Sequence, residues 1–200
     1  GVIIPTGSIE QHGPIGLIGT DMLCVESISS RVGEEAKALV VPALGYAPAE
    51  FNMAFPGTIS LSTTLYKEIC AEIFSSLIRH GFRHIYVLNG HGANIDPMKE
   101  LLERFPDIKI RIKSWWEFPV VNQLRESFYS SWEGMHATPS EVAITQAHYR
   151  IVNSPLSKDP PEKLSNEYIL AHSGDKHGGP ERHRVSFPDG RVGSHSALAK

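Results

Sequence analysis

Cysteine is scarce in this chain of 200 residues: Cys24 and Cys70 stand far apart and are the only two. Two separated cysteines argue against the dense disulfide framework of many small secreted domains. A secretory leader is not recognisable either, because the sequence opens with GVIIP, an apolar run typical of a buried strand. We therefore expect a protein of the reducing cytoplasm.

An excess of charge of one sign and long apolar runs are also missing. The formal net charge is -3, with 19 Lys and Arg against 22 Asp and Glu, so no basic surface for nucleic acid is indicated. Apolar residues make up 41% of the chain but never run for the roughly 20 positions that a membrane-spanning helix needs. We expect no nucleic-acid partner and no membrane association, and the length suits one domain over residues 1–200.

Strand-like and helix-like segments alternate along the chain. Strands are predicted at 2–4, 39–44, 85–88 and 108–116, and helices at 20–39, 62–81, 95–105 and 138–150. The segments 46–62 and 151–200 read as loops, because Pro, Gly and Asn are frequent there. The alternation predicts an α/β fold, a single domain with a mostly parallel β-sheet flanked by helices, with its chemistry at the carboxyl ends of the strands.

The first of these strand ends carries PTGSIEQHGPIGLIGTDM, residues 5–22. Glu10 and His12 are two positions apart, so an extended backbone would project them from the same face. Asp21 follows where the loop meets the next helix, and a helix cap is the alternative interpretation for it. A solvated loop explains poorly why residues 5–22 carry almost no other charged side chains, whereas a metal site needs a few ligand side chains and no others.

The second strand end carries NGHGAN, residues 89–94. His91 lies between two glycines, so the backbone beside it can approach a ligand closely. A phosphate-cradling turn is the competing interpretation, but the glycine spacing of the known phosphate motifs is not present.

A third polar cluster lies at 136–141, with the sequence HATPSE. His136 has the side chain best suited to donate or accept a proton near neutral pH. Thr138, Pro139 and Glu141 fit a capping box at a helix start, so Glu141 is either a cap or a metal ligand. Mixed histidine and carboxylate ligands suit Zn²⁺, Mn²⁺ or Fe²⁺, and an aspartate able to bridge two ions makes a two-metal site plausible.

Five blocks of the sequence together resemble the signature of the creatininase (creatinine amidohydrolase) family. They are PTGSIEQHGPIGLIGTD, FPGTISLS, NGHGAN, HATPSE and FPDGRVGSHSALA, and they run from residue 5 to 199 in the family's order. The resemblance implies a homohexamer of α/β subunits, with a dinuclear metal centre that hydrolyses carbon–nitrogen bonds of small amides, cyclic amides or formamides. Its relatives include formamidopyrimidine deformylases, a hydrolase of inositol-like ketoses and a peptidase.

The resemblance also implies roles for individual residues. Glu10, Asp21 and His91 would hold one metal, and His12 would hold the other, with Asp21 as the bridge. Ala93 stands where creatininase has a further carboxylate, which argues against creatinine as the substrate. Glu141 would complete the second site in its place, as in relatives with the GHGxN form of the turn.

The predicted reaction uses two divalent ions, with zinc favoured over manganese or iron, to activate a water molecule. His136 and Glu141 are the predicted catalytic residues, and His136 would carry a proton to the leaving nitrogen. Substrate contacts are expected from four further residues: Trp132, Glu133, Thr58 and Ser60. For Trp132 a packed aromatic is an equal alternative.

Other interpretations stay open. Ala93 keeps alive a non-catalytic or single-metal subunit with the same fold, and a peptide-processing hydrolase of the same family is a further possibility. A phosphate- or nucleotide-binding module would bind its ligand without metal. The His-bearing tail at 175–195 is predicted either to cover a neighbouring site in an oligomer or to be a solvated loop.

Overall fold

The computed structural model describes residues 1–174 and 176–200, and in them the strands form one four-stranded sheet. The strand order is β2-β1-β3-β4, and every neighbouring pair is parallel. The strands are β1 (Val2–Thr6), β2 (Leu39–Val40), β3 (His84–Asn89) and β4 (Lys109–Ser114). The predicted α/β fold with a parallel sheet flanked by helices is confirmed.

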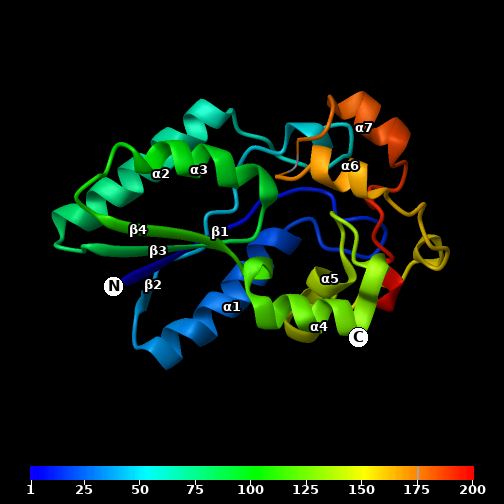
Figure 1. The fold of residues 1–200 in the computed structure, drawn as a ribbon, viewed down its shortest axis with the longest axis horizontal. Coiled ribbons are helices and arrows are strands. Elements are labelled where there is room, and N and C mark those ends of the chain that lie inside the picture. The colour runs from blue at the N-terminus through cyan, green and yellow to red at the C-terminus, as the bar shows by residue number, and fades with distance from the viewer. Residues whose placement is uncertain (175) are drawn as a thin grey trace.

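Helices cover both faces of this sheet (Figure 1). They are α1 (Thr20–Ala36), α2 (Thr63–Arg79), α3 (Ile95–Leu102), α4 (Pro119–Tyr129), α5 (Pro139–His148), α6 (Asn166–Ala171) and α7 (Pro180–Ser186). In Figure 1, α2 and α3 lie above the sheet, α1 lies below it, and α6 and α7 lie beyond the ends of the strands.

Alternate residues of β1 pack into two different cores, because successive side chains of a strand point to opposite faces. Val2 and Ile4 join the larger core, which includes Tyr66 and Phe74 of α2. Ile3 points the other way and packs with Val25 of α1 and with Leu88 and Trp115. Burial on both faces suits the apolar side chains of Val2, Ile3 and Ile4, and polar residues begin with Thr6 at the carboxyl end of β1.

The strand predicted at 39–44 is shorter than expected, since β2 ends at Val40. Pro42 lacks the N–H that a strand ladder needs, and beyond Val41 the chain pairs with β1 again at an isolated bridge between Thr6 and Leu44. The region after β4 and the tail are more regular than predicted, because α4, α6 and α7 form there. Asp175, the first residue of the predicted tail segment, lies outside the described residues. Within the described chain, no helix is long and apolar enough to cross a membrane.

Candidate metal centre

Six ionisable side chains meet where the strands end. Glu10 and His12 come from the loop after β1, Asp21 from the first turn of α1, and His91 from the turn after β3; His136 precedes α5 and Glu141 lies in its first turn. All six are buried, with exposed fractions between 0% for Glu10 and 7% for Glu141. The structure therefore brings together every residue that the sequence suggested as a metal ligand, along with the predicted proton carrier.

Two glycines explain why Asp21 can reach this place. A Cβ atom on Gly7 would lie 2.4 Å from the backbone nitrogen of Met22, and one on Gly90 would lie 2.5 Å from the carbonyl oxygen of Asp21. The first turn of α1 thus packs backbone to backbone against the turns that follow β1 and β3. The glycine before His91 serves this close helix contact, in addition to any approach by a ligand.

The asparagines of NGHGAN fix the turn that carries His91. The Asn89 side chain donates to the carbonyl oxygen of His91 at 2.8 Å and to Ser114 Oγ, at the end of β4, at 3.0 Å. Asn94 donates to the carbonyl oxygen of Gly7 at 3.0 Å. These bonds tie the ends of three strands together, so the imidazole of His91 is held on a rigid support.

The Asp21 carboxylate lies between two imidazoles. Its Oδ1 is 2.8 Å from Nε2 of His12, and its Oδ2 is 3.0 Å from Nδ1 of His91. The hydroxyl of Ser8 donates to Oδ2 at 2.8 Å and orients the group. A carboxylate that presents one oxygen to each of two nitrogen ligands has the arrangement that a bridge between two ions requires.

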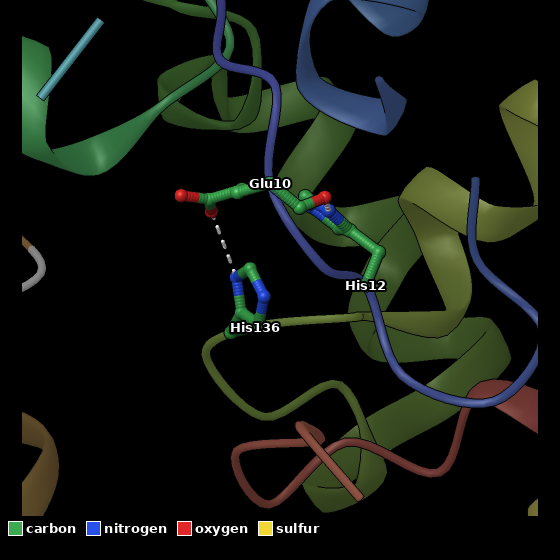
Figure 2. Close-up of side chains that lie close together, drawn as sticks. All are labelled: Glu10, His12 and His136. Carbon is green, nitrogen blue, oxygen red and sulfur yellow. Dashed lines mark hydrogen bonds and ion pairs between the residues drawn. The ribbon is translucent and has the colours of Figure 1, made fainter. Parts of the chain in front are cut away.

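The two glutamates lie on either side of this bridge. Glu10 Oε1 is 3.5 Å from Nδ1 of His91. The same oxygen is 3.4 Å from Nδ1 of His136, the contact marked by the dashed line in Figure 2. Glu141 Oε1 is 3.8 Å from Nε2 of His12. Each side of Asp21 therefore offers a histidine nitrogen and a glutamate oxygen.

All three histidines use one ring nitrogen to hold their orientation. Nδ1 of His12 lies 3.1 Å from the carbonyl oxygen of Glu10, Nε2 of His91 lies 2.7 Å from that of Pro48, and Nε2 of His136 lies 2.7 Å from that of Gln11. A carbonyl oxygen only accepts, so each of these nitrogens carries the proton. The other nitrogen of each ring faces the carboxylates, where a metal ion would replace a proton on that nitrogen and take up its lone pair.

The electrostatics of the cluster favour positive charge. Burial disfavours the charged form of His12, but Asp21, with Glu141 and Glu10, outweighs burial and raises the pKa of His12 to about 10. Burial acts to raise the pKa of Asp21 as well, yet His12 and His91 hold it well below its usual range. Burial raises the pKa of Glu141 to about 7, opposed by His12 and reinforced by Asp21. Three buried carboxylates are stable together only with compensating positive charge, which protons or cations can supply.

The donor set fits divalent metal ions. Three overlapping groups have ligand atoms within 4.8 Å of one another: Glu10, His12 and His136; Glu10, Asp21 and His91; His12, Asp21 and Glu141. Asp21 belongs to two of them and Glu10 to two, so a pair of ions could share ligands here. Imidazole and carboxylate groups without thiolates suit Zn²⁺ and Mn²⁺.

Glu141 does form the capping box that the sequence predicted. Its Oε1 accepts from the backbone N–H of Thr138 at 2.6 Å, and Thr138 Oγ1 accepts from the N–H of Glu141 at 3.2 Å. The same Oε1 is the oxygen nearest to His12. Glu141 therefore caps the helix and faces His12 at the same time, and the capping box itself positions its carboxylate.

A cavity of about 230 Å³ opens next to the centre. Asp21, His91, His136 and Glu141 all line it, and aromatic and apolar lining comes from Trp115, Trp116, Ile95, Met135 and Ile169. Of the residues predicted to contact substrate, none is among those that line this cavity. Thr58 accepts a hydrogen bond from the backbone of Gln11, Ser60 accepts one from Ala49, Trp132 packs on His195, and Glu133 pairs with Arg125. Their contact with substrate stays a prediction.

Two residues of this region were missed in the sequence. Arg125 lines the cavity from α4, where no helix was predicted, although Val120, Leu124 and Phe128 recur there every four residues. Asn52 is fully buried, accepts from Gln11 Nε2 at 2.7 Å, and places its amide nitrogen 3.5 Å from Nε2 of His136. Asn52 lies in a segment rich in loop-forming residues, which carries no signal that distinguishes it.

This chain is similar in sequence to creatininase family proteins. The family model described as creatininase, creatinine amidohydrolase, matches residues 1–200. The creatinine amidohydrolase of Pseudomonas putida is 30% identical over 185 residues, which cover 80% of this chain and 71% of that protein. A mycofactocin precursor peptide peptidase of Mycolicibacterium smegmatis is 31% identical over 103 residues, 48% of this chain and 41% of its own length.

Solved structures share the fold. A crystal structure of creatinine amidohydrolase matches 98% of this chain and 80% of its own, with a TM-score of 0.72 at 24% identity. A manganese form of creatininase matches with a TM-score of 0.71 at 24% identity, and a Zn–Zn form of a creatininase variant with 0.63 at 25%. The latter match covers 92% of this chain and 84% of the other.

Proposed function

Because the chain belongs to the creatininase family of hydrolases, we propose that it hydrolyses a carbon–nitrogen bond of a small amide, cyclic amide or formamide with the help of two divalent metal ions. The observation that carries this proposal is the Asp21 carboxylate, whose two oxygens face Nε2 of His12 and Nδ1 of His91 at 2.8 and 3.0 Å. A cap or a solvated loop charge has no reason to be buried between two imidazoles.

The six side chains of the candidate centre would have different roles. His12, Asp21 and Glu141 would hold one ion, and Glu10, Asp21 and His91 the other. Ions bound there would activate water and polarise the substrate carbonyl. The zinc or manganese of the creatininase structures supports the choice of metals.

His136 is suited to handle the proton. Its Nε2–H is committed to the carbonyl oxygen of Gln11, so its Nδ1 is the atom that can take up and release a proton at the cavity. Amines leave poorly unless protonated, and a positioned acid typically contributes about 10²–10⁴-fold. Glu10 Oε1, 3.4 Å away, would stabilise the protonated ring.

The decisive experiment combines metal analysis with a substrate panel. The protein is purified without chelator, metals per chain are measured by mass spectrometry, and hydrolysis of lactams, formamides and short peptides is followed. We expect two ions per chain, loss of activity after EDTA, and recovery with Zn²⁺ or Mn²⁺. A chain that retains no metal and hydrolyses nothing in the panel would refute the proposal.

A single-metal, non-catalytic subunit is the second candidate, favoured by Ala93 in place of a carboxylate. It predicts one ion per chain and no hydrolysis. The short peptides in the panel test a third candidate function, which the mycofactocin precursor peptide peptidase suggests. Cleavage restricted to peptides would make this chain a peptide-processing member of the family.

A further inference from the structure

A guanidinium group lies at the wall of the cavity beside the candidate metal centre. Among the described residues that line this cavity, Arg125 is the one Lys or Arg, and it shares the space with Asp21, His91 and Glu141. Its side chain is 19% exposed, so it is largely withdrawn from bulk water. A permanent positive charge at such a place needs a partner, and the protein groups that contact Arg125 use only part of its hydrogen-bonding capacity.

Two neighbours fix the direction of Arg125. Its Nε donates to Glu133 Oε1 at 2.8 Å, and its Nη1 donates to Asn122 Oδ1 at 2.9 Å. The guanidinium carbon lies 5.7 Å from the ring centroid of Trp115. Glu133 is itself held by the hydroxyl of Ser140, at the start of α5. In the part of the chain that the structure describes, Nη2 donates to no protein atom.

We propose that Arg125 determines specificity by binding a carboxylate on the substrate through Nη2, with Glu133 as its positioning residue. This inference rests on the proposed function and names the substrate class: an amide that carries a carboxylate, such as an N-acyl or N-formyl amino acid. A planar guanidinium matches a planar carboxylate, and the bond is strong where water is excluded.

The surroundings support a directed contact. Trp115 lies beside Arg125, and Trp116, Met135 and Ile169 add mostly apolar surface to the lining of the same cavity. Glu133 offsets part of the positive charge, so the selectivity should come from the orientation of Nη2 and not from net charge. Glu133 was predicted to contact substrate directly; here it acts through Arg125.

The test uses the fluorescence of Trp115 and Trp116, which both line the cavity. N-acetylglycine and its neutral counterpart N-acetylglycinamide are titrated into the zinc-loaded and the chelator-treated protein. We expect the wild type to bind the carboxylate roughly 10–100-fold more tightly than the amide. Arg125→Gln should abolish this preference in both states, and Arg111→Gln, an equal charge change at an exposed position of β4, should retain it.

Glu133→Gln separates recognition from a merely structural ion pair. The amide oxygen of this variant can still accept from Nε and hold the direction of the guanidinium, so the preference for the carboxylate should persist, whereas a structural role of the ion pair predicts equal effects of Arg125→Gln and Glu133→Gln. Equal binding of the two probes by the wild type, no binding of either, or a preference that survives Arg125→Gln would overturn the inference. Metal content and the substrate panel report on the proposed function independently.

Discussion

Asp21 is the residue on which the candidate centre is organised. Ser8 fixes one of its oxygens, two imidazoles flank it, and the backbone contact at Gly90 sets its position. Its place in the first turn of α1 also satisfies the helix dipole, so the capping interpretation and the bridging interpretation use the same location. A substitution that keeps shape and removes charge distinguishes them.

Asp21→Asn should lower the metal content to one ion per chain or fewer and abolish hydrolysis. The amide is isosteric with the carboxylate but carries no charge to hold two cations. Metal analysis and circular dichroism on the same sample check this, and Asp107→Asn, in the exposed turn before β4, is the matched control. Unchanged metal content in Asp21→Asn would rule out the bridge.

His136→Ala should keep the metal content and lower kcat by about 10²–10⁴-fold, since the proton carrier is lost and the ligands remain. The comparison needs metal analysis beside the rate, because Glu10, His12 and His136 also form a group that could hold an ion. A loss of metal would make His136 a ligand.

At the scale of residues, the sequence predicted well which side chains meet at the candidate metal centre, because chemistry restricts where charged side chains can be buried. Glu10, His12, Asp21 and His91 stood out by type and by position at strand ends, and they do lie together. Asn52 and Arg125 did not stand out, since an amide in a loop and an arginine on a helix have many ordinary uses. Their contacts depend on tertiary packing that no local pattern contains.

At the scale of elements, the first turn of α5 combines a cap with a candidate ligand. Glu141→Gln keeps an oxygen that can accept from Thr138, but it removes the charge, so we expect metal content to fall while the helix persists. Thr138→Ala removes the reciprocal bond and should cost about 0.5–2 kcal/mol of stability with metal retained. Thermal unfolding and metal analysis compare the two. If Glu141→Gln retains full metal, Glu141 is a cap alone.

The helices missed in the sequence were missed for two physical reasons. Helix α4 leaves Val120, Leu124 and Phe128 more than half exposed, so its apolar spacing does not mark a face turned to the core. Helices α6 and α7 span six and seven residues, too short for a periodic pattern; α6 begins at the Ser165 cap, and α7 begins with Pro180 and has no side-chain cap. By contrast α2 buries one apolar side and was predicted almost to its ends.

At the scale of the whole molecule, α6 and α7 lie beyond the sheet and pack beside the candidate metal centre. Ile169 of α6 and Ser173 line the cavity, and Phe51 lies against His177 and His183, at ring separations of 4.9 and 5.2 Å. The tail predicted as a loop thus packs against its own subunit. Homohexamer formation and a cytoplasmic location stay predictions from the resemblance and from cysteine usage; light scattering would check the former.

The buried charges also link the centre to global stability. In the metal-free protein, the pKa of His12 is raised from 6.5 to about 10, so its contribution is complete below pH 6.5 and is lost as pH rises through about 10. The pKa of Glu141 is raised from 4.5 to about 7, so the folded chain loses stability as pH rises from about 4.5 to about 7 and Glu141 ionises. Both shifts have the same sign: alkali destabilises the metal-free chain.

We therefore expect the Tm of EDTA-treated protein to fall by roughly 5–10 °C between pH 6.5 and pH 10. Zn²⁺ or Mn²⁺ should flatten this dependence, because a cation replaces the protons that His12 and Glu141 otherwise retain. His12→Gln removes the group with the larger shift, so its metal-free Tm should vary less over the same range. Calorimetry at several pH values checks both statements, and a Tm that rises with pH in EDTA would show that these carboxylates need no positive partner.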